Sequence, residues 1–267
     1  MKSITHYIKT TIPLLLLLTT FSACNKEDMT GQKAIQVVIN GYNGSADELE
    51  IVIDTARYDK TVSNGKFVLK PASIFDFNAV HTYPMAKKPG ILSIKNPVSG
   101  KVLFTKPLPE SGTKAIFNFI YIDGKEIGLN APAADASTNK LGFYMHYTEN
   151  NDPVDIFLYR KDETNGQEYR EYLAKNVLPG TWVYFNYLPS ANFDHKNEVG
   201  KADICFTKAG TTDQWAFQDD EKQSKTSVFG MGFPLAGEKG LVQSYFVTPG
   251  ASSLDRVRLF FHPDRVQ

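Results

Sequence analysis

The sequence predicts an all-β protein with two tandem Greek-key β-sandwich domains, immunoglobulin-like or transthyretin-like, after an N-terminal signal peptide. Three observations predict this. Apolar residues fall in short runs, rich in β-branched and aromatic side chains, that Gly, Pro, Asn and Asp interrupt. A weak internal repeat divides the chain, and a small polar stretch lies between its halves. The 267 residues suffice for two ordinary domains, and the 42% hydrophobic content excludes wholesale disorder.

The first 23 residues have the features of a signal peptide. Lys2 and Lys9 precede and flank a short apolar run, and small residues lead to Cys24. That run is shorter than the roughly 20 residues that a membrane-spanning helix needs. Ser22-Ala23-Cys24 resembles the lipobox of bacterial lipoproteins, so we expect cleavage before Cys24 and lipidation of its thiol. The alternative is an ordinary secretory signal with a chance cysteine.

Residues 24–33 are the predicted lipidated tether. Lys26, Glu27 and Asp28 place one basic residue before two acids, close behind the lipid cysteine. This order resembles the surface-export signal of Bacteroidota lipoproteins, and a plain solvated spacer is the alternative. Because two or more acyl chains anchor a protein stably, we expect a protein attached to the outer membrane by its lipid and exposed at the cell surface.

Charge and cysteine content exclude several classes of protein. Removal of the signal leaves 27 basic against 29 acidic residues, which argues against a nucleic-acid partner. Cys205 is then the one thiol besides the lipidated Cys24, so no disulfide is possible within the chain. Its apolar surroundings predict a buried core thiol and not a nucleophile.

The strands are predicted from short alternating runs. Leu49, Ile51 and Ile53 share one face of such a run, and Val154, Ile156 and Leu158 share one face of another. The predicted strands are 34–40, 49–55, 66–69, 74–80, 90–95, 101–105, 114–122, 141–147, 154–160, 168–174, 181–187, 201–207, 214–218, 241–247 and 256–262.

The internal repeat aligns residues 35–54 with 140–159 at an offset of 105, which places Glu50 over Asp155. Residues 90–94 then lie over 200–204. Each half ends in an aromatic-aliphatic strand closed by an aspartate, at 116–123 and at 257–264. The stretch 130–140 (NAPAADASTNK) is small and polar, as linkers are. We therefore expect domain 1 at 34–129, a linker at 130–140 and domain 2 at 141–267.

A family resemblance rests on two short runs. Asp152-Pro153-Val154-Asp155-Ile156-Phe157 and Leu178-Pro179-Gly180-Thr181-Trp182 resemble the pattern of DUF4397-type extracellular β-sandwich repeats of bacteria. The lipobox followed by two sandwiches is also similar in layout to Bacteroidota fimbrillins. The first resemblance implies cell-surface modules with no assigned catalytic set, so no site residues are transferred from it.

The sequence contains none of the short motifs of nucleophile elbows, zinc proteases, phosphate loops or EF-hands. We therefore predict no catalytic residue, no metal site and no cofactor. The acidic run Asp219-Asp220-Glu221 is interpreted as a solvated loop. Trp182 is expected in the core, whereas Trp215, Tyr169 and Tyr172 are the candidate ligand-binding residues, because aromatic rings offer flat apolar area at low entropic cost. A position in the core is the alternative for Trp215.

These observations favour a non-catalytic surface lipoprotein whose sandwiches bind a glycan or a protein. A structural fimbrial or adhesin subunit is the alternative, and a hydrolase is a third hypothesis. The predicted partners are the membrane, through the lipid anchor, and a glycan or surface protein, but no nucleic acid.

Overall fold

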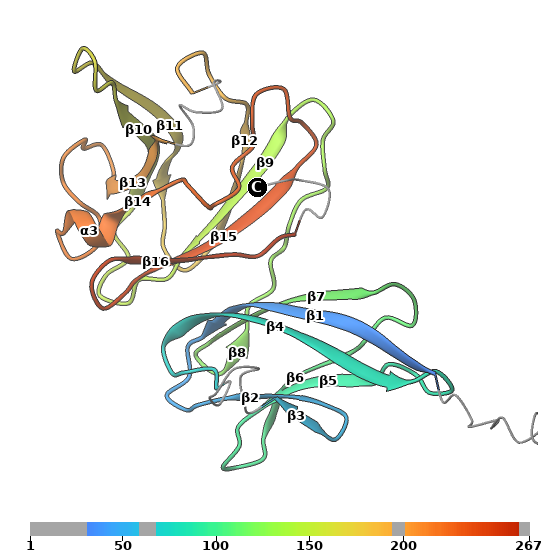
Figure 1. Cartoon of the computed structure of the whole chain (residues 1–267). Helices are drawn as coiled ribbons and strands as arrows, with labels where there is room; N and C mark the ends of the chain where they lie inside the picture. The colour runs from blue at the N-terminus through green and yellow to red at the C-terminus, as the bar shows by residue number, and fades with distance from the viewer. Residues whose placement is uncertain (1–30, 59–67, 194–200, 262–267) are drawn as a thin grey trace, which may run out of the picture. The chain divides into compact units, whose positions relative to one another are not determined.

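A computed structural model describes residues 31–58, 68–193 and 201–261. The predicted signal peptide, Cys24 and the export residues Lys26, Glu27 and Asp28 lie outside these ranges. The described chain is all-β except for one short helix, and its strands form four four-stranded sheets arranged as two β-sandwiches (Figure 1). None of its helices has the length and apolar character that crossing a membrane requires.

The first sandwich contains strands β1 to β8. One sheet has the order β4-β1-β7-β8 and the other has the order β3-β2-β5-β6. The strands are β1 (Gln32–Asn43), β2 (Glu50–Ile53), β3 (Ala56–Tyr58), β4 (Ser73–Pro84), β5 (Ile91–Lys95), β6 (Val102–Pro107), β7 (Lys114–Ile122) and β8 (Lys125–Glu126).

The second sandwich contains strands β9 to β16. Its sheets have the orders β12-β9-β15-β16 and β11-β10-β13-β14. The elements are β9 (Asn139–Met145), β10 (Val154–Lys161), β11 (Glu168–Val177), β12 (Trp182–Tyr187), β13 (Asp203–Lys208), α3 (Glu221–Ser224), β14 (Lys225–Ser227), β15 (Val242–Pro249) and β16 (Leu254–Arg258).

The two sandwiches share one topology. Adding eight to each strand number of the first sandwich gives the strand order of both sheets in the second. The pairing sense also agrees, because β1 runs parallel to β7 and β9 runs parallel to β15. The repeat seen in the sequence therefore corresponds to a repeated fold.

Two parts of the predicted repeat alignment are wrong. Ile51 of β2 pairs with Ile94 of β5, and Ile156 of β10 pairs with Phe206 of β13. The strands β5 and β13 therefore correspond at an offset of 112 and not 110. That two-residue shift keeps every side chain on the same face, so alternation could not reveal it. The counterpart of β7 is β15, whereas Val257 and Arg258 belong to β16, which corresponds to β8.

The core of the second sandwich lies between its two sheets. Leu141, Phe143 and Met145 on β9 belong to one buried cluster with Ile156 and Leu158 on β10. In the first sandwich, edge-to-face ring pairs join the sheets: Phe104 on β6 with Phe119 on β7, and Tyr58 on β3 with Phe77 on β4. Burial of these inward faces stabilises both sandwiches.

Contacts divide the chain into two compact units. The smaller runs up to Ala34 and includes Thr82–Lys88, and in it the Met85 amide donates to the Gly31 carbonyl at 2.7 Å. The larger contains Ile35–His81 and the chain from Pro89 onward. Every site described below lies within the larger unit.

Candidate functional site

The two candidate tyrosines of β11 lie on opposite faces of their sheet. Tyr169 pairs with Arg160, and it packs against the interior cluster. Tyr172 pairs with Phe157, on the face that points away from the interior. Their spacing of three residues in a strand requires this, since successive side chains alternate. The structure thus separates two residues that the sequence grouped together.

The outward face of the β11-β10-β13-β14 sheet carries aromatic rings and cations. We name the set Tyr159, Arg170, Tyr172, Lys175 and Lys225 the aromatic–cationic patch. The Lys175 Nζ lies 4.0 Å from the centre of the Tyr172 ring. The Arg170 guanidinium lies 5.7 Å from the centre of the Tyr159 ring. Each cation is within the roughly 6 Å at which a ring attracts a positive charge.

The cations of the patch differ in their ionic partners. Lys225 is neutralised by Asp203 at 3.3 Å and by Glu221 at 3.1 Å. Arg170 and Lys175 are exposed, and neither forms a salt bridge within the described ranges. Their charges are therefore available to an acidic ligand, held in place by the rings beneath them.

Buried groups lie beneath this patch. Phe157 and Cys205 face the same way as Tyr172 but are only 1% exposed. Burial raises the pKa of the Cys205 thiol to about 12. Cys205 is therefore a packing residue, as the sequence predicted, although it lies beneath the outward patch and outside the interior cluster between the sheets.

Trp215 belongs to the same outward face. It lies opposite Thr207 in an isolated antiparallel bridge, and paired residues share a face. Thr207 alternates with Phe206, which belongs to the interior cluster. The strand that carries Tyr172 and the segment that carries Trp215 are three inter-strand spacings apart, which is roughly 14 Å across the sheet. The structure therefore places two of the three candidate aromatic residues on one surface.

The loop that follows Trp215 is fixed by polar contacts. The Tyr147 hydroxyl accepts from the Gln218 amide at 3.0 Å and donates to Glu149 at 2.9 Å. Gln218 and Asp219 both have positive φ angles, 56° and 52°, which residues other than glycine rarely adopt. These contacts hold the backbone that carries Trp215 in one conformation.

The acidic run Asp219-Asp220-Glu221 has structural partners. Asp219 forms an ion pair with Lys208, and Glu221 pairs with Lys225. The Asp220 carboxylate accepts from the Gln223 amide at 3.1 Å and caps α3. In the described part of the chain, no group of three or more His, Cys, Asp or Glu side chains could hold a metal ion.

A groove that the sequence did not predict lies on the other sheet of this sandwich. Its volume is about 370 Å³, and Trp182, Tyr184 and Tyr144 line it. Trp182 was expected in the core, but its neighbours Val183 and Phe185 take the interior positions instead. Trp182 packs into a separate cluster with Tyr144 and Phe246.

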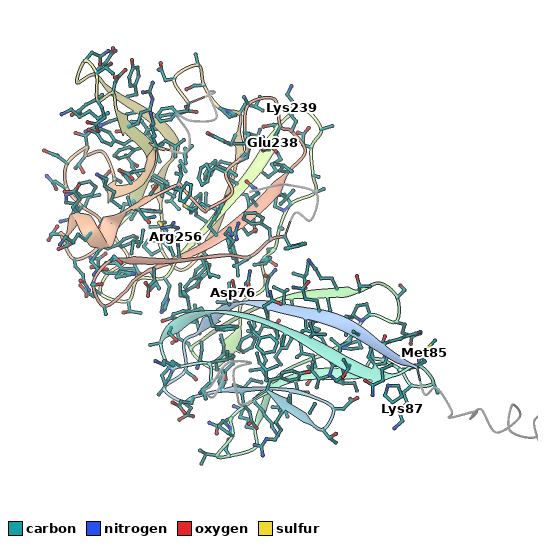
Figure 2. The ribbon with its side chains drawn as sticks, in the orientation of Figure 1. Asp76, Met85, Lys87, Glu238, Lys239 and Arg256 are labelled. Carbon is teal, nitrogen blue, oxygen red and sulfur yellow. The ribbon has the colours of Figure 1, made fainter. Side chains whose placement is uncertain are left out.

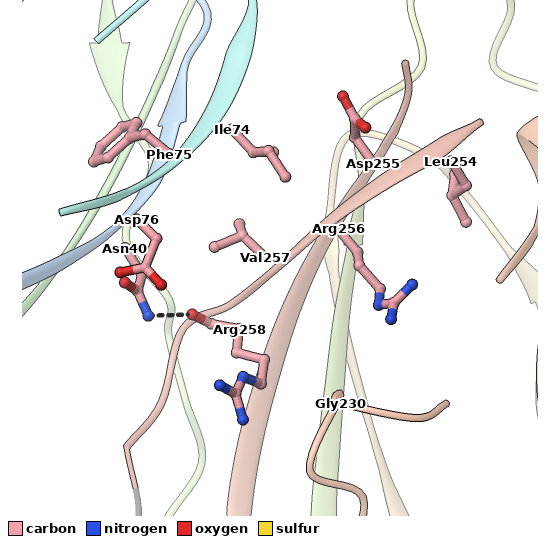
Figure 3. Close-up of a pocket in the computed structure, with 10 residues that line it drawn as sticks. All are labelled: Asn40, Ile74, Phe75, Asp76, Gly230, Leu254, Asp255, Arg256, Val257 and Arg258. Carbon is pink, nitrogen blue, oxygen red and sulfur yellow. Dashed lines mark hydrogen bonds between the residues drawn. The ribbon is translucent and has the colours of Figure 1, made fainter. Parts of the chain in front are cut away.

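A polar hollow of about 500 Å³ lies beside β16 (Figure 3). Its lining includes Asp76 and Arg256, which are labelled in Figure 2. Figure 3 shows Arg256 and Arg258 extending toward Gly230, with Asp255 pointing the opposite way. The Asn40 amide donates to the Arg258 carbonyl at 3.0 Å. Arg256 is committed to the Phe229 carbonyl at 2.9 Å and to the Thr226 hydroxyl. The hollow is therefore part of the packing around β16.

The comparisons with known proteins give distant likenesses. No protein-family profile and no curated protein matches the sequence. A protein of Bacteroides uniformis described as a cell adhesion protein is similar at 12% identity and a TM-score of 0.30, over 88% of this chain and 98% of its own. The carbohydrate-binding module CBMbc of Eubacterium rectale Amy13K, solved with maltoheptaose, is similar at 12% identity and a TM-score of 0.23, over 86% and 99%.

The tip fimbrial protein Mfa3 of Porphyromonas gingivalis is similar at 10% identity and a TM-score of 0.20, over 85% of this chain and 100% of its own. Likenesses this weak carry no argument about function. The functional conclusion therefore depends on the site itself, and the DUF4397-type resemblance stays a prediction of the sequence.

Proposed function

We propose that this protein is a non-catalytic, lipid-anchored cell-surface protein that binds an acidic glycan through the aromatic–cationic patch. One observation carries the proposal: Arg170 and Lys175 lie over aromatic rings on an outward sheet face, without an acidic partner in the described chain. Guanidinium and ammonium groups bind carboxylate and sulfate oxygens. Tyr172 and Trp215 offer ring faces to the apolar sides of sugars.

The spacing of the aromatic residues supports an extended ligand. Tyr172 is 37% exposed, and Trp215 is half-buried at the other side of the sheet. The roughly 14 Å across the sheet between the segments that carry them matches the length of a short oligosaccharide. Such a ligand lying across the patch would contact an aromatic residue at each end and the cations near Tyr172.

Attachment to the outer membrane at the cell surface is the part of the proposal that rests on the sequence alone. Cys24 would carry the lipid, and Lys26, Glu27 and Asp28 would direct export. Metabolic labelling with a palmitate analogue tests this. The proposal requires labelling of the wild-type protein and loss of label in Cys24→Ala.

A glycan array tests the binding site. The mature chain carrying Cys24→Ser would be compared with the same chain carrying Tyr172→Ala or Trp215→Ala. We expect signals on sulfated, sialylated or uronic-acid glycans that each substitution weakens about tenfold or more. Tyr169→Leu, on the inward face of the same strand, is the matched control and should leave the signals unchanged. Equal signals in all variants would overturn the assignment.

The alternative of a structural fimbrial or adhesin subunit makes a different prediction. Such a subunit should assemble into polymers after proteolytic removal of its N-terminal strand. Size-exclusion chromatography of the trimmed protein separates the two functions, because a glycan receptor stays at its original size. The hydrolase hypothesis predicts turnover of the array ligands, which a reducing-end assay would detect.

A further inference from the structure

The groove on the β12-β9-β15-β16 sheet is built from aromatic rings that are fixed before any ligand arrives. Trp182 and Tyr184 are two residues apart on the same face of β12, and their ring centres lie 5.6 Å apart at an interplanar angle of 24°. Tyr144 on the neighbouring strand β9 meets Trp182 edge to face at 5.5 Å. Together the three rings line the groove.

Tyr184 is held in place by a glycine and two hydrogen bonds. Its ring lies over Gly142, where a Cβ atom would come within 2.2 Å of Tyr184 Cε1. Its hydroxyl donates to the Leu129 carbonyl at 2.8 Å and also lies 2.9 Å from the Ser244 hydroxyl. A ring held at both ends loses little entropy when it contacts a ligand.

Trp182 is fixed in the same manner. Its indole N–H donates to the Gly128 carbonyl at 2.9 Å. These hydrogen bonds to the Gly128 and Leu129 carbonyls account for the polar ends of the Trp182 and Tyr184 side chains. They do not explain the groove that remains beside them, whose volume falls within the roughly 300–1,000 Å³ of small-molecule sites.

The lining of the groove selects the chemistry of its occupant. Asn130 and Thr181 also line the groove, and no charged side chain does. The Thr181 hydroxyl donates to the Leu178 carbonyl at 3.2 Å, so its lone pairs remain to accept from a ligand. A pyranose ring has an apolar face of C–H groups and an edge of hydroxyls. The rings of the groove match the former, and the amide and hydroxyl match the latter.

We infer that this groove is a second binding site, specific for one pyranose ring of a neutral sugar. It is independent of the aromatic–cationic patch, because it lies on the other sheet and contains no charged group. The second sandwich would then hold an acidic glycan on one sheet and a neutral sugar on the other.

The two tryptophans of the chain allow each site to be observed alone. Trp182 lines the groove and Trp215 lies on the other sheet face, and the sequence contains no third. Trp215→Phe in the mature Cys24→Ser chain leaves Trp182 as the sole tryptophan. This variant would be titrated with short neutral oligosaccharides of glucose, mannose, galactose, xylose and N-acetylglucosamine. We expect a saturable change in Trp182 emission with at least one of them.

A blocking variant and its control complete the test. Thr181 is exposed beside the groove, so Thr181→Arg should fill the groove and weaken the response about tenfold or more. Thr105→Arg, an exposed threonine on β6, should leave the response unchanged. A response absent with every sugar, or undiminished in Thr181→Arg, would overturn the inference. Trp182→Phe leaves Trp215, on the same sheet face as the aromatic–cationic patch, as the sole tryptophan. Its emission follows acidic-glycan binding there, so failure of the proposed function is distinguished from failure of this inference.

Discussion

At the residue scale, Cys205 shows how burial removes chemical reactivity. The thiol pKa of about 12 follows mainly from desolvation, because burial disfavours the charged thiolate. We predict that the folded mature chain carrying Cys24→Ser does not react with Ellman's reagent near neutral pH. Full reaction should occur after unfolding in guanidinium. Fast labelling of the native chain would contradict this packing role.

Two acids at equivalent positions of the repeat show how duplicated residues acquire different partners. Glu50 and Asp155 are 4% and 3% exposed, at the positions that the offset of 105 superposes. Glu50 accepts from Arg57 at 2.9 Å and pairs with Lys95 at 3.3 Å. Asp155 instead accepts from backbone amides, those of Asn176 and Gly210. Each acid keeps the partners that its burial requires.

At the scale of elements, Gly142 on β9 sets the position of Tyr184 on β12. We predict that Gly142→Ala lowers the free energy of unfolding by about 1–3 kcal/mol, since its Cβ would overlap the Tyr184 ring. In the Tyr184→Ala background the same change should cost little, because the overlapping ring is gone. Urea denaturation of the four proteins measures this coupling, and additive effects would contradict it.

Gly41 on β1 provides the contrasting case. A Cβ there would lie 1.8 Å from the Phe119 carbonyl oxygen, which belongs to the neighbouring backbone of β7. We predict that Gly41→Ala destabilises the first sandwich more than Gly142→Ala destabilises the second. Phe119→Ala should not relieve the cost, because the overlap involves the backbone. Relief by Phe119→Ala in urea denaturation would show that the ring is responsible.

The strands could be predicted largely from alternation and turn residues. The structure confirms 114–122 for β7 residue for residue, and 154–160 lacks only the last residue of β10. The strands β3, β8 and β14 have two or three residues, too short for a periodic signal. The predicted strand 214–218 reduces to the bridge at Trp215, since the backbone turns at Gln218 and Asp219.

The site could be predicted only in part. Alternation alone separates Tyr169 from Tyr172. Strand pairing determines which cations lie beside the aromatic rings, and a single sequence does not specify that pairing. The strand β12 is apolar on both faces, with Val183 and Phe185 opposite Trp182 and Tyr184. When both faces of a strand are apolar, alternation cannot tell the interior from a binding groove.

At the scale of the whole molecule, the shared topology is evidence of duplication that the sequence identities alone supported weakly. The two sandwiches nevertheless differ at their outward sheet faces. The β3-β2-β5-β6 face carries the ion pairs of Glu50, whereas the β11-β10-β13-β14 face carries the aromatic–cationic patch. Specialisation of one copy for binding is consistent with this difference.

Stability should depend on pH through two histidines. Burial lowers the pKa of His146 and of His81, against smaller opposing effects of Asp123 and Asp54. Because the unfolded chain then binds protons more readily, the free energy of unfolding should fall as pH drops below about 6.5. Urea denaturation from about pH 8 to about pH 5 measures this slope. His146→Phe should flatten it, and an unchanged slope would contradict the assignment to His146.

The salt dependence of glycan binding tests the central claim most directly. Isothermal titration of the mature Cys24→Ser chain with an acidic glycan from the array would be run at about 0.05 M and about 0.5 M salt, because screening weakens exposed charge pairs. The patch predicts affinity that falls with salt. It also predicts that Arg170→Gln with Lys175→Gln loses roughly tenfold at low salt and most of the salt dependence. Equal affinity and equal salt dependence in both proteins would show that the glycan binds elsewhere.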